Sequence, residues 1–149
     1  MTKITQSIKI KGNAGDIYQA IATEQGVKNW WTNFASVDEF VGGKAEFHFP
    51  AYDVSKFAEI KTLEPGKQVT WYVTEQKAAA TDWVDTTIDF QLSEADGETL
   101  VEFNHTGWPE NASTFEQCVN GWDYFLKSLK LLVETGTGTP ETKATVAAQ

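Results

Sequence analysis

Apolar and polar residues alternate along several segments of the chain, a pattern typical of half-buried strands. In residues 3–11, Ile4, Ile8 and Ile10 share one face and polar residues occupy the other. Turn signals such as Pro65-Gly66 and Asp96-Gly97 separate the later segments, and short turns imply antiparallel pairing because parallel strands need long crossovers. The sequence therefore predicts an antiparallel meander of about six to seven strands, with its later strands over residues 45–49, 57–63, 69–73, 84–92 and 101–105.

A repeat of three and four residues predicts a long helix near the C-terminus. Its apolar stripe consists of Phe115, Cys118, Val119, Trp122, Phe125, Leu126, Leu129, Leu132 and Val133. Ser113 and Glu116 have the S-x-x-E spacing of a capping box, which predicts the start of this helix. Gly136 can end it in a left-handed conformation.

Two short helices are predicted between the first strand and the rest of the meander. Asn13 can cap the first, and the second holds Val27, Trp30 and Trp31. A single long helix with one wide apolar stripe has to lie across the apolar face of the sheet. This order of elements predicts an α+β fold.

The length of 149 residues is that of one domain. Residues 140–149 contain one Val and no aromatic residue, so they cannot offset the entropy lost on ordering. We therefore predict one domain over residues 1–139 and a flexible tail over residues 140–149.

The charge distribution argues against nucleic acid as a partner. The net charge is −9, from 12 Lys against 21 acidic residues, and Arg is absent. Residues 78–126 contain ten acids and no Lys, so this stretch would repel a polyanion. Without Arg, a buried anion would depend on Lys or backbone donors, and a neutral or weakly polar ligand is expected.

Targeting signals are not evident. Residues 1–11 alternate instead of forming an apolar stretch, which argues against a signal peptide. No run approaches 18 apolar residues, the length that a membrane span requires. A cytoplasmic protein without a membrane partner is expected.

The residues that commonly bind metals are few. A single Cys excludes an internal disulfide and a thiolate cluster. The only His residues, His48 and His105, have opposite strand phases and are predicted to lie on opposite faces of the sheet. We expect no metal site and no cofactor.

His105 is the best candidate for acid–base chemistry, because an imidazole titrates near neutrality and this one is predicted to point inward. A structural His hydrogen-bonded near the following loop is the alternative. The Thr86 hydroxyl, also on an inward face, could orient a ligand or satisfy a strand carbonyl. Cys118 could be a cavity-facing thiol or a small buried hydrophobe.

The inward-facing aromatic residues fit either a solid core or the wall of an apolar cavity. We favour a cavity, because one helix is poorly suited to filling a strongly curved sheet. Trp108 could form part of its rim or cover a helix end. The predicted ligand-binding residues are Trp30, Phe47, Phe49, Trp71, Thr86, Phe103, His105, Cys118 and Trp122.

Four segments resemble a known family: VKNWW (27–31), VGGKAEFHF (41–49), LEPGKQVTWYV (63–73) and GWDYFLKSLKLLVETGTGTP (121–140). Together they resemble the homologues of the activator of the heat-shock-protein-90 ATPase, a branch of the START-like (SRPBCC) superfamily. The resemblance implies a helix-grip fold, in which a curved antiparallel sheet wraps around a long C-terminal helix. It also implies an apolar cavity between the two.

The favoured hypothesis is binding of a small apolar or aromatic molecule without catalysis. A polyketide cyclase or aromatase-like enzyme, with His105 and Thr86 as working groups, is the first alternative. A stress-related co-chaperone module is the second. The eukaryotic activator has an additional N-terminal domain that contributes to its chaperone contact, whereas this sequence begins directly with the first predicted strand, so a chaperone partner is not expected. Edge strands could support a homodimer.

Overall fold

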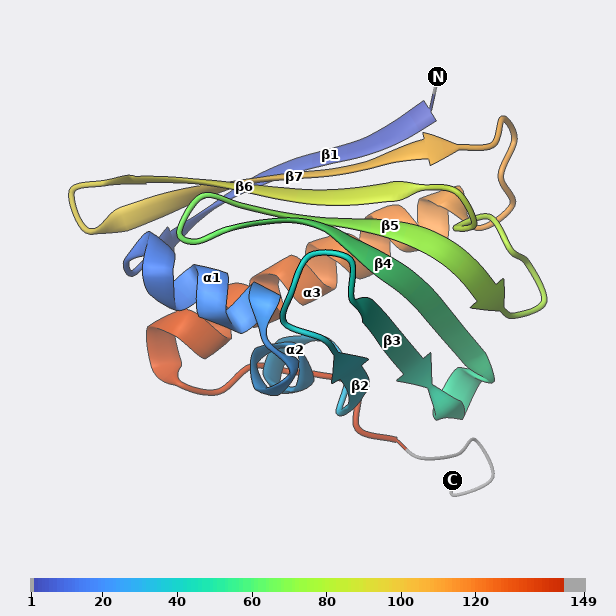
Figure 1. Cartoon of the computed structure of the whole chain (residues 1–149), viewed down its shortest axis with the longest axis horizontal. Coiled ribbons are helices and arrows are strands. Elements are labelled where there is room, and N and C mark those ends of the chain that lie inside the picture. Colours follow the sequence, from blue (N-terminus) through green and yellow to red (C-terminus); the bar gives the residue numbers. More distant parts are fainter. Residues whose placement is uncertain (1, 144–149) are drawn as a thin grey trace.

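A seven-stranded antiparallel sheet curves around the long helix α3 in the computed structural model, which describes residues 2–143 (Figure 1). The strand order is β1-β7-β6-β5-β4-β3-β2. The two short helices α1 and α2 follow the first strand, as predicted, and the α+β helix-grip architecture is confirmed. The elements are β1 (Thr2–Lys11), α1 (Ala14–Ala22), α2 (Glu24–Trp30), β2 (Phe34–Val37), β3 (Lys44–Phe49), the 3-10 helix η1 (Pro50–Tyr52), β4 (Val54–Glu64), β5 (Gln68–Lys77), β6 (Thr87–Ala95), β7 (Glu98–Trp108) and α3 (Phe115–Thr135).

The hairpin of β6 and β7 shows how sequence determines register. Asp96 and Gly97 have φ values of 55° and 80°, as a tight hairpin turn requires, and this turn matches the twist of the flanking strands. Phe90 therefore lies opposite Phe103, and both are buried on the concave face. The concave face of the sheet thus forms one side of the core.

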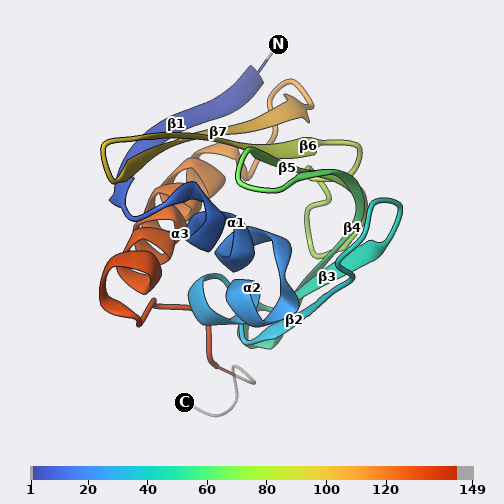
Figure 2. The same cartoon turned by 60° about the vertical axis from the view of Figure 1, so that its left-hand side comes forward.

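The three helices lie on the concave side of the sheet (Figure 2). Asn13 caps α1 as predicted, since its side-chain oxygen accepts from the Asp16 N–H at 2.8 Å. The buried Trp30 ties α2 to α1, because its Nε1–H donates to the Ala20 carbonyl at 2.7 Å. These contacts fix the end of α2, where Trp31 enters the interior.

The two ends of α3 were predicted with different success. Gly136 has φ 90° and its N–H donates to the Leu132 carbonyl, which confirms the left-handed end. The capping box was wrong, because α3 begins at Phe115 and Thr114 is its N-cap without a side-chain cap bond. The carboxylate of Asp82 accepts from both the N–H and the hydroxyl of Thr114 instead. A negative charge at this position also suits the positive end of the helix dipole.

The predicted strand over residues 84–92 begins later than expected. Residues 78–86 form a loop, and β6 starts only at Thr87. Asp85 has a positive φ of 68° within this loop. The loop carries Trp83 into the interior, where only 3% of its surface is exposed.

The chain returns to the fold after α3. The Thr139 N–H donates to the Ser128 hydroxyl at 2.7 Å. Glu141 forms a parallel bridge with Thr32, with backbone bonds to Trp31 and Asn33. Residues 144–149, most of the predicted tail, lie outside the described residues, and the boundary between domain and tail stays a prediction.

None of the helices found in residues 2–143 has the length and hydropathy needed to cross a membrane.

Candidate functional site

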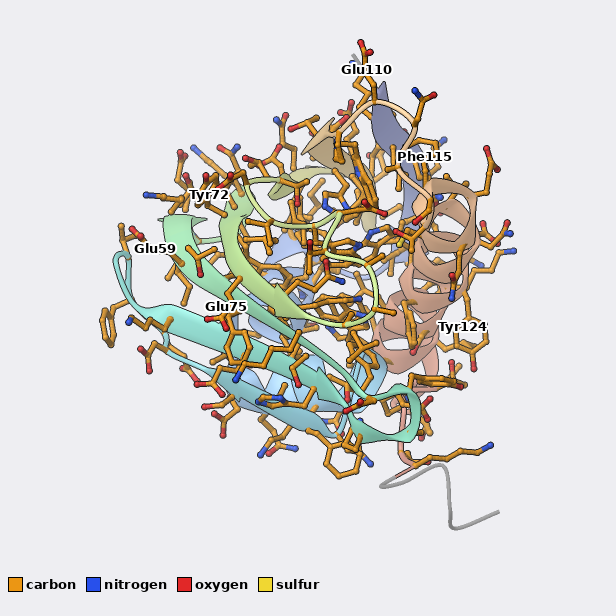
Figure 3. All side chains as sticks on the ribbon, turned by 90° about the vertical axis from the view of Figure 1, so that its right-hand side faces the viewer. Glu59, Tyr72, Glu75, Glu110, Phe115 and Tyr124 are labelled. Carbon is orange, nitrogen blue, oxygen red and sulfur yellow. The ribbon has the colours of Figure 1, made fainter. Side chains whose placement is uncertain are left out.

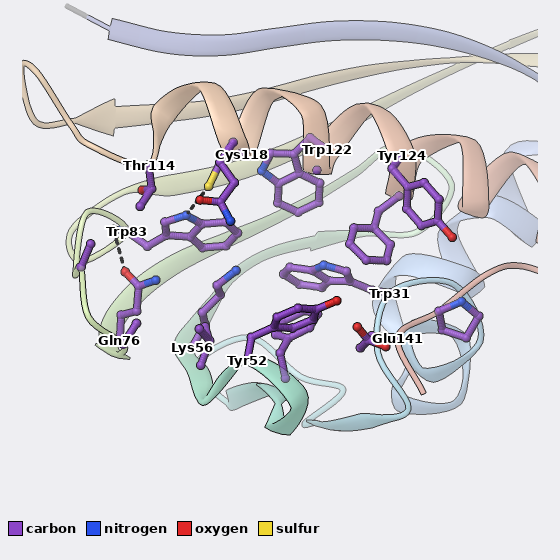
Figure 4. A pocket seen from close by; sticks show the side chains of 18 of the residues that line it. Trp31, Tyr52, Lys56, Gln76, Trp83, Thr114, Cys118, Trp122, Tyr124 and Glu141 are labelled. Carbon is purple, nitrogen blue, oxygen red and sulfur yellow. Dashed lines mark hydrogen bonds between the residues drawn. The ribbon is translucent and has the colours of Figure 1, made fainter. Parts of the chain in front are cut away.

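A cavity of about 650 Å³ lies between the sheet and the first half of α3 (Figure 4). Cavities of this size accommodate drug-sized molecules. Strands β4 and β5, the 78–83 loop and residues 139–141 complete its wall. Its aromatic lining residues are Trp31, Phe49, Tyr52, Trp83, Trp122, Tyr124 and Phe125.

Three indole rings from three different elements form one wall of the cavity. Trp31 follows α2, Trp83 lies in the 78–86 loop and Trp122 projects from α3. Their ring centroids are 6.2 Å apart for Trp31 and Trp83, 5.8 Å for Trp83 and Trp122, and 5.0 Å for Trp31 and Trp122. We call these residues the tryptophan wall.

Lys56 of β4 places an ammonium group in this aromatic surrounding. Its Nζ lies 3.6 Å from the ring centroid of Trp83 and 4.9 Å from that of Phe49, which is cation–π geometry. The side chain is partly exposed, and it lines the cavity. Burial away from bulk water lowers the pKa of Lys56 to about 8, and the nearby Cys118 opposes this effect.

Trp83 is held in place by two neighbours that also line the cavity. Its backbone N–H donates to the Gln76 side-chain oxygen at 3.0 Å. Its indole N–H donates to the Cys118 sulfur at 3.2 Å. Strand β5 and helix α3 thereby fix a ring that comes from a loop.

The mouth of the cavity is lined by two exposed tyrosines and an acid. Figure 3 shows Tyr124 projecting from α3 at the outer surface, and 54% of it is exposed. Tyr52 is 64% exposed, and the carboxylate of Glu141 raises its pKa. The backbone bridge between Glu141 and Thr32 holds this acid at the mouth.

Three of the predicted ligand-binding residues line the cavity: Phe49, Cys118 and Trp122. The other six are fully or almost fully buried in the core and are absent from the lining: Trp30, Phe47, Trp71, Thr86, Phe103 and His105. Trp108, considered for the rim, packs against Phe115 at a centroid distance of 5.4 Å and so covers the start of α3.

His105 and Thr86 belong to a closed chain of hydrogen bonds behind the tryptophan wall. The indole N–H of Trp122 donates to His105 Nδ1 at 3.1 Å. Since Nδ1 accepts, the proton of the neutral ring is on Nε2 and is donated to Thr86 Oγ1 at 2.8 Å. The Thr86 hydroxyl in turn donates to the Trp83 carbonyl at 2.6 Å. Every donor and acceptor in this chain is used.

The pKa of His105 is lowered to about 3 by burial, with a further contribution from the positive charge of Lys56. The ring is therefore neutral at physiological pH and makes no contact with the cavity. His48 lies on the other face, as predicted, where it contacts Ser55 and Glu46. Within residues 2–143, no group of three or more His, Cys, Asp or Glu is arranged to hold a metal ion.

Sequence reasoning missed Lys56 as a site residue. Its strand phase is that of the buried Ala58 and Ile60, so a Lys at an inward position was the available signal. No such signal indicated that Trp83 points inward, because loop residues have no periodic phase. The same holds for Glu141, which the sequence places in a predicted tail.

A family model described as Activator of Hsp90 ATPase homolog 1-like protein matches residues 11–134. No curated protein matches the chain. The solution structure of the Aha1 dimer from Colwellia psychrerythraea is 34% identical over 93% of this chain and 100% of that chain, with a TM-score of 0.80.

More distant structures share the fold alone. DynU16, a protein in the dynemicin biosynthetic locus, is 16% identical over 96% of this chain and 50% of that chain, with a TM-score of 0.73. A conserved protein of unknown function from Enterococcus faecalis is 24% identical over 93% of this chain and 75% of that chain, with a TM-score of 0.71.

Proposed function

The chain belongs to the Activator of Hsp90 ATPase homolog 1-like family, and from this membership and the cavity we propose that it binds a small apolar or aromatic molecule between the sheet and α3. The observation that carries the proposal is the tryptophan wall facing about 650 Å³ of space. Each Å² of apolar surface removed from water contributes roughly 25 cal/mol, so a ring packed on this wall would be held mainly by burial.

Gly121 offers a direct test, because it lines the cavity from α3 and an added Cβ would meet no atom within 4 Å. Gly121→Phe should fill the cavity without displacing the backbone, whereas Gly121→Ala should leave most of it open. The neutral dye N-phenyl-1-naphthylamine reports entry into apolar sites by increased fluorescence. We expect saturable 1:1 binding to the wild type and Gly121→Ala, and none to Gly121→Phe.

Equal dye binding by the wild type and Gly121→Phe would contradict the proposal, as would a wild type that binds no dye. Native mass spectrometry of the purified protein gives a second readout, because a retained small molecule would be lost in Gly121→Phe and kept in Gly121→Ala.

Activation of a chaperone ATPase is the second candidate function. Family membership supports it, and Phe40 and Val41 add an exposed apolar pair, with 60% and 59% of their surfaces exposed. The test is the ATPase rate of purified Hsp90 with wild-type protein and with a Phe40→Ser/Val41→Ser variant. Stimulation that the double variant loses would support this function, and no stimulation by the wild type would remove it.

A homodimer is proposed on the strength of the 34% identical Aha1 structure, which is described as a dimer. Light scattering coupled to size-exclusion chromatography will decide this, since a mass near 33 kDa is expected from two chains of 16.6 kDa. A concentration-independent mass of one chain would exclude it.

The enzyme hypothesis receives less support from the geometry. His105 and Thr86 bond to each other in the core and do not line the cavity. A cyclase-like reaction and a cytoplasmic location remain predictions from the sequence.

A further inference from the structure

We infer that the ligand of this cavity carries a carboxylate, held by the Lys56 ammonium and the Gln76 side-chain amide, with its apolar body on the tryptophan wall. The inference rests on the proposed function, because it names the chemical class of ligand for the same cavity.

Lys56 has no anionic partner of its own. Within the described residues, no carboxylate lies within 4.0 Å of its Nζ and no acceptor is hydrogen-bonded to it, whereas Lys61 and Lys127 pair with Glu59 and Asp123. An ammonium has three N–H donors, and the described residues accept none of those of Lys56. The N–H donors of Lys56 are therefore free to bind a negatively charged acceptor that enters the cavity.

The aromatic rings stabilise the charge of Lys56 but do not accept hydrogen bonds from all of its N–H groups. The face of Trp83 attracts the charge of Lys56 at 3.6 Å, but a ring face leaves N–H groups on the open side of the ammonium. With its pKa lowered to about 8, Lys56 is still mainly protonated at pH 7. A cation is thus retained on the cavity wall where a ligand can reach it.

Gln76 supplies a second donor beside the ammonium. Lys56 and Gln76 are directly opposite each other on β4 and β5, and such cross-strand pairs have Cβ atoms about 5 Å apart. Because the Gln76 side-chain oxygen accepts from the Trp83 N–H, its NH₂ group remains as a donor. The two oxygens of one carboxylate can each take one of these donors.

Glu141 and Cys118, the two other groups of the cavity that could pair with Lys56, already have partners of their own. The Glu141 carboxylate at the mouth accepts from the backbone N–H groups of Thr142 and Lys143, at 2.9 and 3.2 Å. The Cys118 sulfur accepts from the Trp83 indole. The sequence favoured a neutral ligand because Arg is absent, and Lys56 changes that expectation.

The test compares two probes that differ in charge but hardly in shape: 2-naphthoate and 2-naphthamide. At pH 7 we expect the wild type to bind 2-naphthoate at least about 10-fold more tightly, the effect of one charge-assisted hydrogen bond. Lys56→Gln should weaken 2-naphthoate binding by about 10-fold or more and change 2-naphthamide binding by less than about 3-fold. Lys67→Gln, an exposed site in the turn between β4 and β5, makes the same charge change and should alter neither affinity.

The outcomes separate this inference from the proposed function. Binding of 2-naphthamide without a preference for 2-naphthoate, or a preference that persists in Lys56→Gln, overturns the carboxylate inference and leaves the proposed function standing. Failure of both probes to bind the wild type overturns the proposed function as well.

If Lys56→Gln does not fold, a pH series with the Lys56 side chain in place tests the same inference. In a Cys118→Ser background, 2-naphthoate affinity should fall as the pH rises from 7 to 9.5 and Lys56 loses its proton, while 2-naphthamide affinity stays constant. The other titratable groups near Lys56 are Tyr52, Tyr124 and Glu141 at the mouth and His105, which packs against Trp83. The pKa of Tyr52 is raised by Glu141, away from this range, and the pKa of His105 is lowered by burial to about 3, well below it. A flat 2-naphthoate profile contradicts the inference.

Discussion

Two basic side chains pack against the same indole ring, that of Trp83, and have opposite environments. His105 lies in the core with its ring centroid 4.6 Å from that of Trp83, and Lys56 lies in the cavity with its Nζ 3.6 Å from the same ring. Both of His105's ring nitrogens are hydrogen-bonded, whereas the Lys56 ammonium contacts aromatic faces and has no hydrogen-bond acceptor among the described residues.

The difference teaches how to separate a structural polar group from a functional one. A buried group whose donors and acceptors are all used stabilises one arrangement of the core. A group in an open cavity whose N–H donors have no acceptor in the protein can bind an acceptor that a ligand supplies.

The largest effect is expected from His105→Phe. This change leaves the Trp122 indole N–H without an acceptor and Thr86 without a donor, both in a fully buried setting. We expect the free energy of unfolding at pH 7 to fall by about 3 kcal/mol, measured by urea denaturation. His48→Phe, at a partly exposed position, is the control and should change it by less than about 0.5 kcal/mol. Similar values for both variants would remove the structural role of His105.

Lowering the pH should reduce the free energy of unfolding through the same residue, His105. The pKa of His105 is about 3 in the folded protein, below the ordinary value of 6.5, so the unfolded chain binds more protons between these values. Stability is fully present above pH 6.5 and declines as the pH falls toward 3. From this residue we expect a loss of about 2–3 kcal/mol at pH 4.5.

The measurement is the difference in unfolding free energy between the wild type and His105→Asn, which keeps an acceptor for Trp122. This difference should shrink as the pH is lowered from 7 to 4.5. A difference that stays constant would show that His105 takes up its proton equally in both states.

Lys56→Met should act in the opposite direction and stabilise the protein. The folded protein lowers the pKa of Lys56 from 10.5 to about 8, so the charged side chain is disfavoured by folding at every pH below 8. We expect a gain of about 1–2 kcal/mol at pH 7, since the contact with Trp83 offsets part of the burial penalty. The gain should diminish as the pH rises from 8 to 10.5, where folded wild type has already lost the proton. Loss of stability at pH 7 would indicate that Lys56 is structural after all.

The smallest change in unfolding free energy is expected at Gly121, which lines the same cavity as Lys56. Gly121 lies inside α3, where Ala is favoured over Gly by about 0.5–1 kcal/mol, and nothing obstructs a Cβ there. Gly121→Ala should therefore raise the unfolding free energy by that amount in thermal or urea denaturation. A destabilised Gly121→Ala would mean that this part of the cavity is closed in solution.

The residues that surround His105 in the core could be predicted from the sequence. Alternation placed Phe103 and His105 on one inward face, and the helical repeat placed Trp122 on the apolar stripe that faces the sheet; all three are buried. Periodicity predicts such contacts because each element has one buried face. The predicted start of α3 failed because Thr114 interacts with Asp82, which is 32 residues away in sequence.

The residues that line the cavity around Lys56 could be predicted much less well. Its wall depends on Trp83 in a loop and on Glu141 beyond α3, and neither position has a period from which a direction could be inferred. Lys56 had the right phase, but whether an inward Lys is buried, paired or open to a cavity depends on contacts between distant segments. Of the predicted ligand-binding residues, only Phe49, Cys118 and Trp122 line the cavity.

The tryptophan wall has an optical consequence. Its three indoles lie with ring centroids 5.0 to 6.2 Å apart, so they share excitation energy, and a positive charge rests on one of them. A molecule that enters the cavity, or a proton that leaves Lys56, will change the emission and the near-ultraviolet dichroism of all three rings together. The unlabelled protein thus reports the occupancy of its own cavity.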